Sequence, residues 1–169
     1  KIPKKPSILL TFDDGYLDHY KNVFPILLKK RVSGIFYTPI ITFKKNKVLD
    51  VNKIHFILEK ENNRRKIINF IDVSLRKYLK KNLIEMNLKK LNLFNRWDDE
   101  ETTLIKRLLQ DHLPEIVRLK ILNKLFKNVM NESEIEFSKK LYMSQKDICE
   151  MSKNGMYFGI HGCNHKRLS

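Results

Sequence analysis

Three short apolar runs near the two ends of the chain predict β-strands. They cover residues 7–12, 34–38 and 157–160, and the first reads S-I-L-L-T-F between Pro6 and an Asp-Asp-Gly sequence. A short and nearly continuous apolar run is typical of a strand buried on both faces. We therefore expect residues 7–12 to form a central strand of a parallel sheet.

Helical periodicity separates the first two runs. Apolar residues recur at helical spacing over residues 17–31, and Gly34 follows the last of them. The chain therefore opens with a β-α-β unit, from which parallel sheets and barrels are built. The same rhythm returns near the C-terminal end, where Ser144 is a predicted N-cap for a helix over residues 145–153 and Gly155 follows its end.

The middle of the chain contains almost no turn-forming residues. All five glycines lie outside residues 35–154, and Pro114 is the only proline from residue 40 onward. We therefore expect a single domain over residues 1–169 that carries a mainly helical insertion at about residues 45–141.

Two apolar stripes predict helices within this insertion. The stripe over residues 104–109 follows Asp98, with Glu101 placed three residues later as a candidate capping-box partner. The stripe over residues 116–130 follows Pro114, a residue that suits the first turn of a helix.

Composition excludes several classes of protein. Hydrophobic residues make up 42% of the 169 residues, which excludes a fully disordered chain. Apolar stretches stay well below the roughly 20 residues that a membrane-spanning helix needs, and the N-terminal segment does not resemble a secretory signal. Two cysteines are too few for a disulfide framework. We expect a soluble, cytoplasmic protein.

The charge is strongly positive. There are 34 Lys and Arg residues against 19 Asp and Glu residues, giving a formal net charge of +15. Such a surface attracts anions over a Debye length of about 8 Å, so peripheral contact with an anionic membrane or glycan is expected. The lysines are scattered without a dense basic block, so we expect no specific nucleic-acid partner. The oligomeric state is left open.

Acidic and imidazole side chains follow two of the predicted strands. Asp13 and Asp14 come after the first strand, and His161 and His165 come after the last. Asp-Gly alone is turn chemistry and a lone H-x-x-x-H spacing is common. Two histidines and one carboxylate together supply the three protein ligands of a catalytic zinc site. Parallel α/β folds gather such residues at the carboxyl ends of their strands.

We expect the remaining histidines and Cys163 to have no chemical role at the site. His19, His55 and His112 have no partner motif, so we expect them at surface or core positions. Cys163 lies between the two candidate ligands and is expected to be a bystander thiol.

Residues 11–15 (T-F-D-D-G) and 161–165 (H-G-C-N-H) resemble the first two motifs of the polysaccharide deacetylase family, the NodB-homology or carbohydrate esterase family 4 domain. The resemblance implies an α/β fold, a distorted (β/α) barrel that is partial here. It also implies that Asp13 is the general base and that Asp14, His161 and His165 bind a divalent metal, usually zinc. The family usually has Ser or Thr, whose hydroxyl helps to fix the loop, where this chain has Gly162.

The implied reaction is hydrolysis of an amide carbon–nitrogen bond in an N-acetylated carbohydrate, a polysaccharide or a surface glycan. The tract at residues 50–56 and the insertion are similar to a bacterial subgroup associated with surface-glycan biosynthesis. A metal ion lowers the pKa of bound water to about 7 and polarises the carbonyl, while the base accepts a proton. Two alternatives stay open: a non-catalytic metal- or glycan-binding remnant, and a basic helical interaction module.

The resemblance covers only the family's first motifs. Its later motifs carry an arginine that orients the base, a hydrophobic segment and a histidine that acts as the general acid, and they would follow His165. Because the sequence given runs from Lys1 to Ser169, we expect either a piece of a longer product or a degenerate relative. On that expectation, activity needs the missing C-terminal half.

Overall fold

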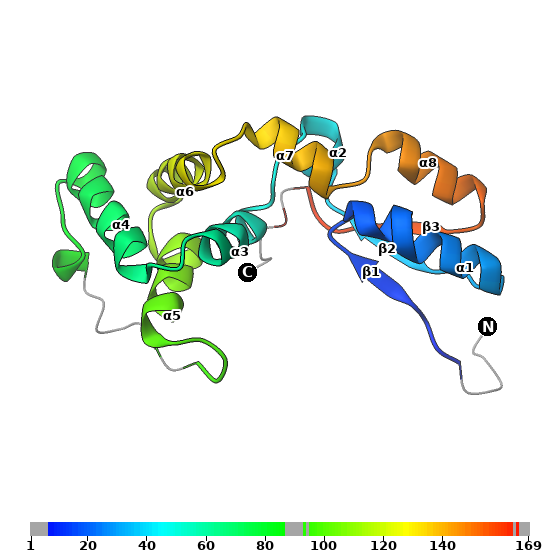
Figure 1. The fold of residues 1–169 in the computed structure, drawn as a ribbon, viewed down its shortest axis with the longest axis horizontal. Coiled ribbons are helices and arrows are strands. Elements are labelled where there is room, and N and C mark those ends of the chain that lie inside the picture. The colour runs from blue at the N-terminus through cyan, green and yellow to red at the C-terminus, as the bar shows by residue number, and fades with distance from the viewer. Residues whose placement is uncertain (1–6, 87–92, 94, 164, 166–169) are drawn as a thin grey trace. The chain divides into compact units, whose positions relative to one another are not determined.

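The computed structural model describes residues 7–86, 93, 95–163 and 165 (Figure 1). The fold is mixed α/β and mostly helical. The chain divides into two compact units, one formed by Lys1–Leu49 with Ser133–Ser169 and the other by Asp50–Glu132.

A three-stranded parallel sheet organises the first unit. Its strands are β1 (Thr11–Asp13), β2 (Ile35–Thr38) and β3 (Tyr157–Ile160), in the order β1-β2-β3 (Figure 1). Asp13 lies opposite Tyr37 in the β1–β2 pair. Because the strands are parallel, their carboxyl ends meet at one edge of the sheet. The predicted parallel sheet is confirmed for these strands, whereas a complete barrel is not shown.

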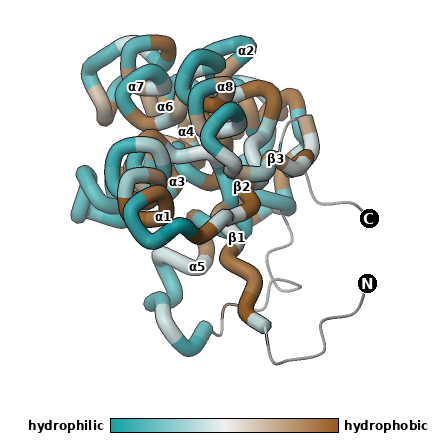
Figure 2. The backbone as a smooth tube through the Cα atoms, turned by 90° about the vertical axis from the view of Figure 1, so that its right-hand side faces the viewer, coloured by the Kyte–Doolittle hydropathy of each residue, from teal (hydrophilic) through white to brown (hydrophobic). Residues whose placement is uncertain are grey.

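The prediction of a central, doubly buried first strand is wrong. β2 is the central strand, and β1 lies at an edge of the described sheet. The apolar stretch that leads into β1 is visible in Figure 2, and there Ile8 and Leu9 are 91% and 66% exposed. The apolar run reports which residues could be buried, but burial depends on which elements cover them.

Helices cover one face of this sheet. The predicted helix over residues 17–31 forms as a π-helical stretch, η1 (His19–Val23), followed by α1 (Phe24–Lys30). Pro25 lacks the N–H that would bond the Lys21 carbonyl in an α-helix, which accounts for the wider turn before it. The core on this face contains Phe24, Leu27, Phe36, Met143, Met151 and Met156.

The last helix of this unit, α8 (Gln145–Lys153), has the predicted bounds and caps. Ser144 and Asp147 form a capping box, in which the Ser144 Oγ accepts a bond from the Asp147 N–H and the Asp147 carboxylate accepts one from the Ser144 N–H. Gly155 follows with a φ of +83°, a left-handed conformation that glycine adopts at helix ends.

Two further helices complete the first unit, α2 (Ile40–Lys45) and α7 (Glu134–Leu141). The Glu134 carboxylate accepts hydrogen bonds from the Lys47 Nζ at 3.0 Å and the Val48 N–H at 3.1 Å. These contacts tie together the two chain segments that lead into and out of the second unit.

The regular secondary structure described in the second unit is entirely helical. Its helices are α3 (Asp50–Lys60), α4 (Arg64–Leu79), η2 (Ile84–Met86), α5 (Glu100–Arg107), η4 (Leu108–His112) and α6 (Glu115–Met130). Fully buried side chains line their contacts, among them Ile54, Ile57, Ile67, Ile71, Leu75, Leu108, Ile121 and Leu122. No helix in the described part of the chain is both long enough and apolar enough to cross a membrane.

The N-cap of α5 differs from the prediction by one residue. Asp99 is the cap, and its carboxylate accepts a hydrogen bond from the Thr102 N–H at 2.7 Å. Asp98 instead binds Lys106 at 2.7 Å, and Glu101 forms an ion pair with Arg65. Four consecutive acids at residues 98–101 offer several similar caps, so the tertiary ion pairs decide which carboxylate remains for the helix end.

Candidate metal centre

The two adjacent aspartates lie at the carboxyl end of β1 and have different surroundings. Asp13 ends the strand and is exposed, whereas Asp14 is half-buried. Asp14 and Gly15 have φ angles of +68° and +70°, so the backbone turns sharply between strand and helix. Aspartate tolerates this left-handed conformation better than most residues, and glycine adopts it freely. The turn therefore directs neighbouring carboxylates to different environments.

Gly15 is required for a second reason, which is space. A Cβ atom at this position would collide with the side chain of Thr38, at the carboxyl end of β2. The turn can therefore pack against the sheet edge only because residue 15 has no side chain.

The loop after β3 carries the two histidines. Its backbone carbonyls at Gly162 and Cys163 accept hydrogen bonds from the N–H groups of Ile40 and Ile41, at 3.4 and 3.1 Å. Both donors lie in the first turn of α2, where N–H groups have no partner within the helix. These main-chain bonds fix the loop, and Gly162 contributes a φ of +71° that favours glycine at this position.

The structure brings Asp14, His161 and His165 together. The two Nε2 atoms lie 3.0 Å apart, and the Asp14 Oδ1 lies 3.4 Å from that of His161 and 3.3 Å from that of His165. Although buried, this Oδ1 atom has no hydrogen-bond partner in the described part of the chain. Three ligand atoms therefore converge, and one of them is a desolvated carboxylate oxygen without a hydrogen bond.

These residues fit a divalent metal ion. Zinc bonds of about 2.0–2.1 Å in tetrahedral geometry place neighbouring ligand atoms about 3.3–3.4 Å apart. Two of the three distances match this spacing and the third, 3.0 Å, is slightly shorter. Leaving a buried acceptor unsatisfied costs about 1–3 kcal/mol, more for a charged group. A bound cation would remove that cost, and three protein ligands would leave one tetrahedral position open.

Asp13 lies outside this cluster. Among the described residues, the group that could hold a metal consists of Asp14, His161 and His165. The Asp13 carboxylate is exposed and has no hydrogen-bond or ion-pair partner in the described part of the chain. This carboxylate is therefore accessible to water.

Tyr16 is a site residue that the sequence reasoning missed. Its hydroxyl donates a hydrogen bond of 3.1 Å to the Oδ2 of Asp14, the carboxylate oxygen that does not face the histidines. Its ring stacks on that of Tyr142, with centroids 5.8 Å apart and planes 15° apart. A polar aromatic residue two positions after the second aspartate was the available signal in the sequence.

His19 also lies beside the turn, packed against aromatic rings. Its ring centroid is 5.6 Å from that of Phe12, 5.7 Å from that of Tyr16 and 5.8 Å from that of Phe36. Burial lowers the pKa of this histidine, although the negative charges of Asp14, Asp18 and Asp13 oppose that effect. Among the described residues, the atoms that converge in the cluster belong to Asp14, His161 and His165, and His19 lies beside them. The Cys163 thiol is free and exposed.

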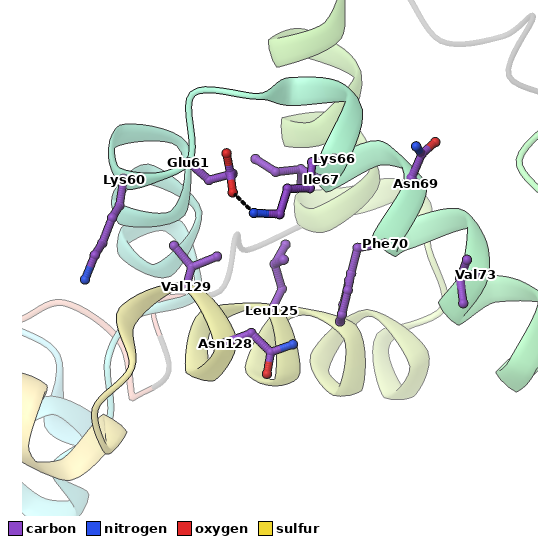
Figure 3. Close-up of a pocket in the computed structure, with 10 residues that line it drawn as sticks. All are labelled: Lys60, Glu61, Lys66, Ile67, Asn69, Phe70, Val73, Leu125, Asn128 and Val129. Atoms are coloured by element: carbon purple, nitrogen blue, oxygen red, sulfur yellow. Dashed lines mark hydrogen bonds and ion pairs between the residues drawn. The ribbon is translucent and has the colours of Figure 1, made fainter.

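The second unit contains a separate groove of about 530 Å³ between α4 and α6 (Figure 3). Buried Ile67 and Leu125 form part of its apolar lining, and an ion pair between Lys66 and Glu61 lies at its rim (Figure 3). No local pattern in the sequence predicts this groove, because two helices that are distant in the sequence form it together.

Comparisons of the chain with protein-family models, with curated proteins and with solved structures find no match. The interpretation of the metal centre therefore depends on its own geometry and on the motifs that carry it.

Proposed function

We propose that this protein is a metal-dependent hydrolase that removes N-acetyl groups from a carbohydrate, with a partial barrel of the NodB type. The convergence of Asp14, His161 and His165, with the neighbouring Asp13 left outside, carries the proposal. The resemblance of residues 11–15 and 161–165 to the polysaccharide deacetylase motifs supplies the class of reaction.

Each acid has one task in this proposal. Asp14, with His161 and His165, would hold Zn²⁺, for which two imidazoles and a carboxylate are suitable ligands. Zinc in such a site lowers the pKa of bound water and polarises an amide carbonyl. Asp13 would accept the proton of the water as its oxygen adds to the amide carbon. The family's general acid, a histidine of a later motif, would protonate the nitrogen as the carbon–nitrogen bond breaks, so that acetate and a sugar amine are the products. A base that also ligated the metal could not serve in this way.

The sheet face that carries Asp13 supports a carbohydrate substrate. In parallel strands, residues in register point to the same face, so Asp13 and Tyr37 share one. The Tyr37 ring lies over Gly159, where a Cβ atom would collide with it. Tyr157, on the same face, is 64% exposed. Aromatic rings with a polar end suit sugar rings, which present both apolar C–H groups and hydroxyls.

The proposal predicts that substitutions of the two aspartates have different effects on zinc binding and on acetate release. Asp14→Asn and His161→Ala should weaken zinc binding strongly, because each removes one of three ligands. Because activity is expected to need the family's later motifs, acetate release is measured on a version of the domain that contains them. There Asp13→Asn should keep zinc binding and lose about 10²–10⁴-fold in acetate release from N-acetylglucosamine oligosaccharides. Zinc binding is measured by titration of the metal-free protein, and acetate release by a coupled assay.

His112→Ala is the matched control, because this histidine lies in the second unit, and it should change neither measurement. Absence of zinc binding by the unmutated protein would overturn the metal centre. Zinc binding without acetate release by the version that contains the family's later motifs would overturn the hydrolase and favour the non-catalytic metal-binding alternative. Equal loss of zinc in both aspartate variants would show that the assigned roles are wrong.

A further inference from the structure

The two oxygens of the Asp14 carboxylate have different surroundings. Oδ2 accepts a hydrogen bond from the Tyr16 hydroxyl at 3.1 Å. Oδ1 has no hydrogen bond in the described part of the chain and faces the Nε2 atoms of His161 and His165. The tyrosine therefore fixes the rotation of the carboxylate and determines which oxygen points toward the histidines.

Tyr16 is itself held independently of Asp14. Its ring stacks on Tyr142, and the backbones of the two residues form an antiparallel bridge. The Met143 N–H donates to the Gly15 carbonyl at 2.9 Å, which fixes the turn between Asp14 and Tyr16. Tyr142 is only 3% exposed, so this support belongs to the core of the unit.

The hydroxyls of three tyrosines in this unit have different partners. The Tyr142 hydroxyl accepts a hydrogen bond from the Leu49 N–H at 3.1 Å. The Tyr20 hydroxyl donates to the Glu150 carboxylate at 2.8 Å. Tyr16 binds a residue of the candidate metal cluster, so its hydroxyl can affect the metal in a way that the other two cannot.

We propose that Tyr16 is a positioning residue of the metal centre: its hydroxyl holds Asp14 so that only Oδ1 is presented to the ion. This inference rests on the proposed function, because it requires Asp14 to be a ligand. Hydrogen-bonding partners of metal ligands orient those ligands, and their loss typically reduces metal affinity by about 10–100-fold.

The experiment compares Tyr16→Phe with Tyr142→Phe and Tyr20→Phe. Each substitution removes one hydroxyl and keeps the ring. Zinc affinity is measured by competition with a chelator, and the geometry of the site by the visible absorption of the Co²⁺-loaded protein. The melting temperature of the metal-free protein reports any structural role.

We expect Tyr16→Phe to bind zinc about 10–100-fold more weakly and to change the Co²⁺ spectrum. The two control variants should retain the affinity and spectrum of the unmutated protein. Unchanged affinity in Tyr16→Phe would overturn the inference while leaving the metal centre intact. Failure of the unmutated protein to bind zinc would instead overturn the proposed function. A Tyr16→Phe protein that stays unfolded with saturating zinc would also overturn the inference, since the hydroxyl would then be structural.

Discussion

The left-handed backbone conformation at Asp14 and Gly15 positions the side chains of the candidate site. Left-handed residues other than glycine cost roughly 1–2 kcal/mol, and such residues are concentrated at functional positions. Here the conformation separates two adjacent carboxylates and lets Tyr16 reach back to Asp14. The close approach of Gly15 to Thr38 determines how near this turn lies to the sheet.

At the residue scale, Gly15→Ala should be much more harmful than Gly155→Ala. Both glycines have positive φ, so both substitutions cost about 1–2 kcal/mol in backbone conformation. A Cβ atom at Gly15 meets Thr38, whereas one at Gly155 has no atom within 4 Å among the described residues. We expect an additional loss of about 1–3 kcal/mol in Gly15→Ala, measured by urea unfolding. Zinc affinity should fall in this variant only, and equal destabilisation of both would contradict the account.

The motifs around Asp14 could be predicted from the sequence, but its partner Tyr16 could not. The residues of the cluster stand out because their types suit a metal and because each follows an apolar run. The role of Tyr16 depends on its stacking with Tyr142, 126 residues later. Local patterns do not encode such a contact, since it arises only when the whole unit has folded.

Among the secondary-structure elements, prediction was most accurate where local chemistry decides the outcome. The bounds of β3 and α8 follow from an apolar run, a serine cap and a glycine, and they are confirmed. The N-cap of α5 was misplaced because ion pairs with distant residues compete for the acids there. The position of β1 in the sheet was wrong, because sheet order depends on pairing across the chain.

The capping box of α8 makes a prediction at the scale of the element. Ser144→Ala removes the side-chain acceptor for the Asp147 N–H and should cost about 1 kcal/mol of unfolding free energy. Ser152→Ala, at an exposed position within the same helix, should be close to neutral, because alanine is a good helix former. Thermal and urea unfolding of both variants provide the comparison. A cap variant as stable as the Ser152 variant would show that the box does not stabilise α8.

At the scale of the whole molecule, the candidate metal centre described here takes all of its residues from the first unit, and the second unit is helical. Asp14, His161 and His165 belong to the first unit, which has its own apolar core. The two segments of the first unit that flank the second unit meet at Glu134, where Lys47 and Val48 bind the same carboxylate. The first unit therefore holds the ends of the insertion close together with contacts of its own.

Replacing residues 50–132 with a short glycine–serine linker should therefore preserve the metal centre. We expect the shortened chain to fold cooperatively and to bind zinc with an affinity within a few-fold of the intact protein. Circular dichroism during heating and the same zinc titration measure the two properties. A shortened chain that folds but no longer binds zinc would show that the helical unit contributes to the site.

The separation of the ligands along the chain also orders the events of biosynthesis. Asp14 precedes His161 by 147 residues, which at about 5–20 residues per second corresponds to about 7–30 s of translation. The second unit, Asp50–Glu132, is synthesised entirely within this interval. Folding of that unit shortens the loop that β3 must close to pair with β2, since closure entropy rises with loop length. The three residues of the candidate metal centre can thus converge only after the whole second unit has been synthesised.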